Sequence, residues 1–478
     1  MSEMSFTQDS LKTKLGQLEC HFTWELKKED LDLNNLLNRL EEQVELDLGR
    51  EQGVARTHNS LGFVKFLCGL KEEALSHLLR SEVLINESLK DNCDKTLIVT
   101  YGNFAWLNYH MENYTECESY LQRLQKINEK FHTESSSVPE VLGEKGWTFL
   151  KFSRKYYDRA KEVFVKALEL EPGHGEWNAG YAIALYRTET ESSCKVDSPA
   201  IKQLRQAIDI TPDNDVLRVL LGLKLLLCSK TLMKESEKLV EEALNGSPEN
   251  PHVMRYVGIF FRDQGSIDRS VALLKKGLES SPNSCFIHHQ LALCYKNKKL
   301  NLQRERRDTE VVDEARDKII YHMEKATSLK ASFIIAMSEL ALQYAERGDL
   351  YIAEELFEKT FKTATEIKDH LHVVHFHYAQ YQQYSTRQED LAIQHYKESL
   401  AIGPHTGEGT RSAQKLMKIA QRRIKNDPND WKANEIVGLI YQVKGEMWRD
   451  NKCHANASSN EEDDEHLKNL DELIMYFQ

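Results

Sequence analysis

Glycine and proline are scarce in this chain, which has only 22 glycines and 9 prolines among 478 residues. A fold made of many tight turns needs more of both, so their scarcity argues against an all-β protein. No apolar run approaches the length that spans a bilayer, and the N-terminal MSEMSFTQDS lacks the hydrophobic stretch of a signal peptide. We therefore expect a soluble, cytosolic protein with no membrane partner.

The sequence also lacks the local motifs of the common enzyme classes. No P-loop, GxSxG, HExxH or Rossmann fingerprint occurs. The one histidine-rich run, DHLHVVHFHY, places only pairs such as His372 and His375 on one helix face, and two ligands rarely make a metal site. Nothing in the sequence therefore predicts catalysis, a metal or a cofactor.

Paired cysteine motifs are missing as well. The nine cysteines include no CxxC pair, their number is odd, and most have apolar neighbours. Cysteines of this kind are typical of small buried residues in a reducing compartment. We expect them to be free thiols that pack in the core.

Basic residues are outnumbered by acidic ones, 63 to 75, and the formal net charge is −12. Proteins that bind DNA or RNA without regard to sequence usually carry a basic domain, so this balance argues against DNA as a partner. Net charge governs solubility and long-range attraction, and it does not exclude a local basic pocket. A specific anion-binding site therefore stays possible within an acidic chain.

The strongest positive signal is a recurring helix ending. The segments AKEVFVKALELEPGH, PAIKQLRQAIDITPDN, SEKLVEEALNGSPEN and SVALLKKGLESSPNS are amphipathic and each closes on a proline. These prolines, Pro172, Pro212, Pro248 and Pro282, follow one another at intervals of 40, 36 and 34 residues. The spacing indicates tetratricopeptide (TPR) repeats, whose period is about 34 residues.

Helix packing explains this pattern. Small residues let the two helices of a repeat approach closely, while large apolar residues fill the space between neighbouring repeats. One repeat cannot bury its apolar face alone, so successive repeats stack into a superhelix with a concave binding face. The predicted fold is therefore an all-α TPR superhelix, or α-solenoid, with a helical N-terminal region.

Departures from the repeat suggest four parts of the chain. Residues 296–316 read as a polar insertion between two repeats, and the stretch after Gly445 is polar and acidic where a second helix is expected. We predict an N-terminal helical and TPR subdomain at 1–140, a central TPR subdomain with the binding pocket at 141–295, a C-terminal TPR subdomain at 296–450, and an acidic, disordered tail at 451–478.

Several segments resemble the interferon-induced proteins with tetratricopeptide repeats. The resemblance runs from CHFTWEL through TYGNFAWLNYHM, GWTFLKFSRKYYDRAK, GYAIALYR, RYVGIFFR and HHQLALCYK to HFHYAQYQQY, and it covers roughly residues 10–445. The resemblance implies a cytosolic, non-catalytic antiviral protein. Some members hold the 5′ end of foreign single-stranded RNA, triphosphorylated or capped without ribose 2′-O methylation, in a positively charged channel; others bind sister proteins of the family.

The same resemblance implies the residues of an RNA site. Trp147 matches the tryptophan that stacks on the cap base, and Glu176 matches an acid that accepts hydrogen bonds from the guanine edge. Arginine suits phosphate because its planar donors meet two oxygens at once. The remaining positions that match the RNA path are Arg39, Gln43, Lys151, Tyr157, Arg187, Arg255, Tyr256, Arg262, His289 and Gln290.

A second function remains open at this point, namely that of an adaptor that binds sister proteins or signalling partners without RNA. The arrangement of the basic residues distinguishes the two. Convergence of Arg39, Lys151, Arg187, Arg255 and Arg262 on one enclosed pocket favours RNA, and an open groove favours protein.

Overall fold

The computed structural model describes residues 2–45, 51–90, 93–131, 138–189, 196–228 and 230–443. Within these ranges every regular element is a helix, as predicted, and no helix has the length and apolar character to cross a membrane. The chain forms two compact units, Met1–Ile287 and His288–Gln478. The finer division at residue 140 stays a prediction, and the predicted tail at 451–478 lies outside the described residues.

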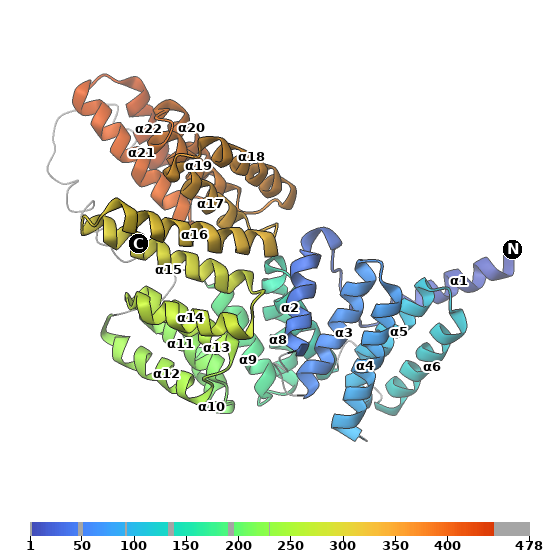
Figure 1. The fold of residues 1–478 in the computed structure, drawn as a ribbon. Helices are drawn as coiled ribbons and strands as arrows, with labels where there is room; N and C mark the ends of the chain where they lie inside the picture. The colour runs from blue at the N-terminus through green and yellow to red at the C-terminus, as the bar shows by residue number, and fades with distance from the viewer. Residues whose placement is uncertain are drawn as a thin grey trace. The chain divides into compact units, whose positions relative to one another are not determined.

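The first unit is built from consecutive helices that pack in pairs, α3 with α4 and so on to α13 with α14. The first helices of the later pairs, α7, α9, α11 and α13, also pack against one another and form a continuous layer. Three of them, α9, α11 and α13, are labelled in Figure 1. The helices are α1 Ser2–Leu15, α2 Leu33–Glu45, α3 Glu51–Leu67, α4 Lys71–Leu89, α5 Asp94–His110, α6 Tyr114–Phe131, α7 Pro139–Phe152, α8 Tyr157–Leu170, α9 Gly175–Thr188, α10 Pro199–Ile210, α11 Asp215–Cys228, α12 Met233–Gly246, α13 Pro251–Gln264 and α14 Ile267–Ser280.

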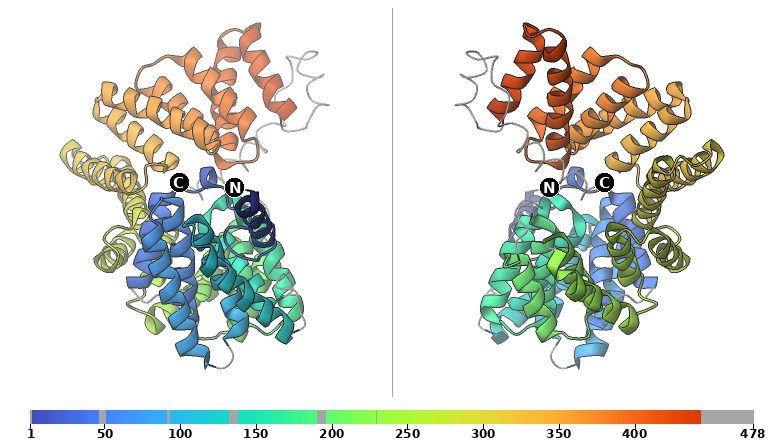
Figure 2. Two further views of the ribbon diagram at one scale, coloured as in Figure 1. Left: turned by 90° about the vertical axis from the view of Figure 1, so that its right-hand side faces the viewer. Right: turned by 90° about the vertical axis from the view of Figure 1, so that its left-hand side faces the viewer.

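The second unit continues the same pairing, which the orange and red helices of Figure 2 show from two sides. Its helices are α16 Thr309–Leu329, α17 Ile334–Arg347, α18 Leu350–Ile367, α19 Leu371–Tyr384, α20 Glu389–Ile402, α21 Gly407–Asn426 and α22 Trp431–Val443, after α15, Cys285–Arg304, which begins in the first unit. The insertion predicted at 296–316 is mostly helical, because it contains neither glycine nor proline and simply lengthens α15 and α16.

The four repeat prolines occupy equivalent turns. In each, the residue before proline has an extended φ between −127° and −135°, as the proline ring requires. Its carbonyl accepts a hydrogen bond of 3.1–3.2 Å from the backbone N–H three residues later, so proline is the second residue of a tight turn. The residues that end these turns and start the next helices are His174, Asn214, Asn250 and Ser284.

Phe164 shows why the repeat needs small residues. This fully buried ring of α8 is enclosed by Gly146 of α7 and Gly180 of α9. A methyl group at Gly146 would lie 2.8 Å from the ring, and one at Gly180 would overlap it. The two glycines therefore let α7 and α9 pack against the same aromatic side chain.

We expect Gly180→Ala to lower the free energy of unfolding by about 1–3 kcal/mol, because the added methyl group overpacks the core. Urea denaturation measures the change. Gly173→Ala is the matched control, since a methyl group there meets nothing within 4 Å, and its effect should stay within about 0.5 kcal/mol. Equal effects of the two substitutions would contradict this account of Phe164.

The cysteines depart in one place from the expected free thiols. Cys20, Cys68, Cys93, Cys117, Cys285 and Cys294 are thiols outside any disulfide, and four of these six are buried. Cys228, at the end of α11, is disulfide-bonded. The prediction was wrong there because it relied on spacing along the chain, and folding can bring together sulfur atoms that are distant in sequence.

Candidate nucleic-acid interface

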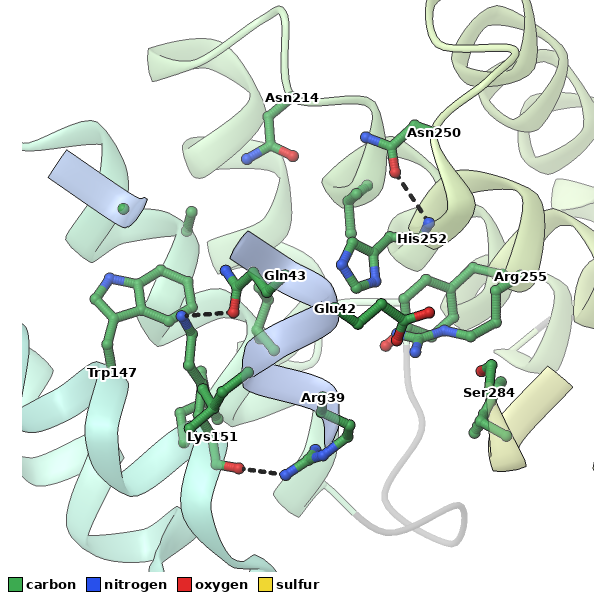
Figure 3. Close-up of a pocket in the computed structure, with 18 of the residues that line it drawn as sticks. Arg39, Glu42, Gln43, Trp147, Lys151, Asn214, Asn250, His252, Arg255 and Ser284 are labelled. Atoms are coloured by element: carbon green, nitrogen blue, oxygen red, sulfur yellow. Dashed lines mark hydrogen bonds between the residues drawn. The ribbon is translucent and has the colours of Figure 1, made fainter. Parts of the chain in front are cut away.

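The first unit contains a cavity of about 1330 Å³ on the layer formed by α7, α9, α11 and α13. Helix α2 closes one side of it, and α2 lies between the α7 and α13 residues in Figure 3. Eight of the twelve predicted site residues line the cavity: Arg39, Gln43, Trp147, Lys151, Glu176, Arg187, Arg255 and Tyr256.

Two arginines are held by the C-terminal end of α7. Arg39 Nη2 donates to the carbonyl oxygen of Lys151 at 2.9 Å, and Arg187 Nη1 donates to that of Leu150 at 2.9 Å. The last carbonyls of a helix have no partner within the helix and carry partial negative charge. They therefore orient both guanidinium groups while leaving the positive charges without a counter-ion.

Aromatic rings support the same arginines. Tyr157 lies outside the cavity lining, but its hydroxyl accepts from Arg187 Nη1 at 3.3 Å, and the Arg187 guanidinium lies 5.2 Å from its ring centre. Arg255 lies between the rings of Tyr256 and Phe286, at 4.6 and 4.7 Å from their centres. Contacts of this kind fix a cation without neutralising it.

Lys151 completes the cluster one helical turn after Trp147. Its Nζ donates to Gln43 Oε1 at 3.2 Å and lies 5.9 Å from the Trp147 ring (Figure 3). Burial, together with the charges of Arg56 and Arg39, lowers the pKa of Lys151 to about 7. Lys151 therefore gains full charge only when an anion approaches or the pH falls.

Like charges are crowded in this cluster. Among the described residues, Arg39, Lys151, Arg187 and Arg255 form no ion pair with a carboxylate. Burial and the neighbouring Arg187 lower the pKa of Arg39. Burial raises the pKa of Tyr256, but Arg255 and Arg187 outweigh it and bring the value to about 8. Crowded positive charges with no carboxylate paired to them repel one another, so the arrangement is suited to an anionic ligand.

Helix ends add to this positive potential, a feature that the sequence analysis missed. The four turn-ending residues His174, Asn214, Asn250 and Ser284 all line the cavity, so the N-termini of α9, α11, α13 and α15 lie at its wall. Helix N-termini carry partial positive charge and favour anions. The repeating turn could have indicated this from the sequence.

Acidic side chains also line the cavity, mostly on α2 and in the turn before α11. Three of them are in ion pairs: Glu41 with Lys65 at 2.8 Å, Asp215 with Arg218, and Glu176 with Arg56. Glu42 extends from α2 toward the side that carries the α13 residues (Figure 3). The positive charge is therefore concentrated around the end of α7 and the adjoining α9.

Trp147 provides a flat apolar surface beside this cluster. Its ring is partly buried, and its edge packs on Phe164 at 5.6 Å with an interplanar angle of 83°. Its buried Nε1 has no hydrogen-bond partner in the structure. The residue is therefore part of the cavity wall, where its ring can stack on a planar ligand group.

Glu176, at the start of α9, is paired with a residue that the sequence analysis did not select. Arg56 Nη2 of α3 donates to Glu176 Oε2 at 2.8 Å, and both side chains line the cavity. Arg56 lies in a helix whose sequence shows no unusual cluster of charge, so no local signal identified it.

Four predicted residues do not line the cavity: Tyr157, described above, and Arg262, His289 and Gln290. Arg262 lies on the same helix as Arg255 but two turns further along, where it pairs with Asp263 at 2.7 Å. His289 and Gln290 belong to the second unit and are buried there, with His289 packed on Phe333 at 4.8 Å between ring centres. Their part in RNA binding stays a prediction. Within the described ranges, no three His, Cys, Asp or Glu side chains gather as a potential metal site.

The fold and the cavity together define a class: an all-α TPR solenoid whose first unit holds a cation-lined cavity suited to a polyanion with a planar group. No family model matches the chain. Its similarity to individual proteins is nevertheless extensive, and it shows that the chain belongs to the family of interferon-induced proteins with tetratricopeptide repeats. The resemblance found in the sequence is thereby confirmed.

Three human relatives illustrate the similarity. The antiviral innate immune response effector IFIT1 is 35% identical over 91% of this chain and 93% of its own length. The IFIT1 homolog B is 36% identical over 94% and 96%, and the interferon-induced protein with tetratricopeptide repeats 2 is 33% identical over 92% and 93%.

Solved structures of human IFIT1 agree with the fold over most of the chain. A human IFIT1 dimer with PPP-AAAA has a TM-score of 0.80 at 34% identity and covers 93% of this chain and 98% of that one. A dimer with m7Gppp-AAAA has a TM-score of 0.82 at 34% identity with the same coverage.

Proposed function

We propose that this protein is a non-catalytic antiviral effector that binds the 5′ end of foreign single-stranded RNA, either a triphosphate or a cap lacking 2′-O methylation. Holding the 5′ end would block translation by denying it to initiation factors. The observation that carries the proposal is the convergence of Arg39, Lys151, Arg187 and Arg255 on one cavity, beside Trp147. The IFIT1 structures with PPP-AAAA and m7Gppp-AAAA support the same ligand class.

The proposal includes the cytosol as the site of action and sister family proteins as further partners. Human IFIT1 is described as a dimer in both RNA-bound structures, which supports association within the family. The adaptor function becomes the better explanation if the cavity binds no RNA.

The test is a fluorescence titration of the purified protein at physiological salt with four short RNAs. They differ only at the 5′ end: hydroxyl, triphosphate, unmethylated-ribose cap and 2′-O-methylated cap. We expect the triphosphate or the unmethylated-ribose cap to bind more tightly than the hydroxyl end. Equal binding of all four, or none, would contradict the proposal.

Binding should weaken as the pH rises from 6 to 8, because Lys151 has a pKa of about 7 in the free protein and must be charged to meet phosphate. The charged fraction falls from about nine-tenths to one-tenth, so the affinity should fall about tenfold. An RNA with a cap is the ligand of choice, since its bridging phosphates do not titrate in this range.

Lys151→Arg is the matched variant, because arginine stays protonated throughout. Its affinity should depend much less on pH, with a remaining decline from Tyr256 and from the buried Glu144, whose pKa burial raises to about 7. A pH profile identical to that of the unaltered protein would remove Lys151 from the phosphate site.

A further inference from the structure

The ion pair between Arg56 and Glu176 brings opposite charges from two distant helices to the cavity wall. Arg56 Nη2 and Glu176 Oε2 are 2.8 Å apart, and the side chains are 17% and 31% exposed. Both are thus shielded from bulk solvent while remaining part of the lining. A ligand in the cavity meets the two groups as one polar surface.

Most of the hydrogen-bonding capacity of this pair is unused. Among the contacts of the described residues, the Arg56–Glu176 bond is the only hydrogen bond that either side chain makes. A guanidinium has five N–H donors and a carboxylate has about four acceptor positions. Several donors and acceptors therefore remain for a ligand.

The order of these groups matches one nucleobase edge. The pair offers two acceptor oxygens on Glu176 and, beside Oε2, the N–H donors of Arg56. The Watson–Crick edge of guanine presents donor, donor and acceptor: N2–H₂, N1–H and O6. Adenine has an amino donor where guanine has O6, and this donor would face the N–H of Arg56. Adenine also has an acceptor at N1, which would face an oxygen of Glu176, so like groups would meet at both positions.

Stacking alone cannot supply this discrimination. An aromatic ring such as Trp147 stacks on every base, because every base has a π-face. Selectivity has to come from polar groups that meet the base edge, and a mismatched buried donor is left unpaired at considerable cost. The Arg56–Glu176 pair is a polar surface of this kind on the same cavity as Trp147.

We propose that Arg56 is a guanine-specificity residue: it donates to O6 while Glu176, held by the same ion pair, accepts from N1–H and N2–H₂. The inference rests on the proposed function and adds Arg56 to the guanine contact that the family resemblance implies for Glu176. On this inference Arg56 contacts the ligand directly, whereas the ion pair with Glu176 alone would give it only a structural role.

The experiment compares RNAs of one sequence that carry a guanosine cap, an adenosine cap or a 5′ triphosphate. The unaltered protein should prefer the guanosine cap to the adenosine cap by about tenfold or more. Arg56→Met should remove most of this preference, measured as the ratio of the two cap affinities, because the change that the loss of Arg56 makes to the charge of Lys151 affects both caps equally. Arg56→Lys, which keeps a charged donor, should retain part of the preference.

Each contrary outcome has a distinct meaning. Tighter binding of the guanosine cap by Arg56→Met would show that Arg56 blocks Glu176, and an unchanged base preference would show a structural role; either overturns the inference. Failure of the unaltered protein to bind any of the RNAs would instead overturn the proposed function.

If Arg56→Met misfolds, a measurement on the unaltered protein still tests the inference. An inosine cap keeps O6 and N1–H but lacks the N2 amine, whereas a 2-aminopurine cap keeps the amine but lacks O6 and has an acceptor in place of N1–H. The inosine cap should bind more tightly, by about tenfold. Equal affinities, or tighter binding of the 2-aminopurine cap, would overturn the assignment of Arg56 to O6.

Discussion

Arg187→Ala should weaken binding of triphosphate and capped RNA alike, on the order of 10- to 100-fold, because a charge-assisted hydrogen bond to phosphate is lost. Arg187 is held between the Leu150 carbonyl and the Tyr157 hydroxyl, at 2.9 and 3.3 Å. Because this orientation is fixed, we expect the same loss of RNA affinity whichever base follows the 5′ phosphates. Fluorescence titration with each 5′ end measures it.

The salt dependence gives a second and independent readout. Removing one phosphate contact should lower the slope of log affinity against log salt by about one unit. Arg205→Ala is the matched control, because Arg205 is an exposed arginine of α10 paired with Glu235 outside the cavity. A slope unchanged in Arg187→Ala would exclude Arg187 from the phosphate site.

Trp147→Ala should weaken capped RNA by about 5- to 100-fold and triphosphate RNA far less, since stacking on a nucleobase contributes about 1–3 kcal/mol. The expectation follows from the position of the ring on the cavity wall, one turn before Lys151. Competition between capped and triphosphate RNA on the same protein sample measures the difference directly.

Trp147→Phe is the control for packing. It keeps an aromatic face and the contact with Phe164, so it should retain much of the cap affinity. If Trp147→Ala weakens both RNA ends equally, the ring does not stack on the cap and only supports the cavity wall.

Much of the fold could be predicted because a repeat leaves a local signature. The pre-proline turns at Pro172, Pro212, Pro248 and Pro282 follow from the ring geometry of proline, which acts within two residues. The small residues around Phe164 also repeat with the period. By contrast, no periodic signal describes a disulfide, so the one at Cys228 could not be anticipated.

The binding site was predicted in part, and the reasons are physical. Convergence of Arg39, Lys151, Arg187 and Arg255 came from the family resemblance and not from spacing, since helices distant in sequence supply them. Arg262 lies seven residues after Arg255, a spacing that preserves the helix face but moves roughly 10 Å along the axis. That shift takes Arg262 past the cavity lining.

Arg56 was missed because a single arginine in a helix without any cluster of charge has no local distinction. Its importance comes from its contact with Glu176, which lies 120 residues later in the chain. Tertiary pairing of this kind creates a hydrogen-bonding surface that neither residue has alone. Polar pairs that line a cavity therefore have to be found in the structure.

The orientation of Arg39 and Arg187 does not depend on the identity of the side chains at the end of α7. Arg39 and Arg187 are oriented by main-chain oxygens of Leu150 and Lys151, which every amino acid at those positions would supply. Helix α7 stops at Phe152, and Ser153 turns extended with φ −152° and ψ 146°. A substitution at either position would keep these oxygens in place, whereas inserting or deleting one residue in α7 would rotate them by about 100° and abolish recognition of phosphate.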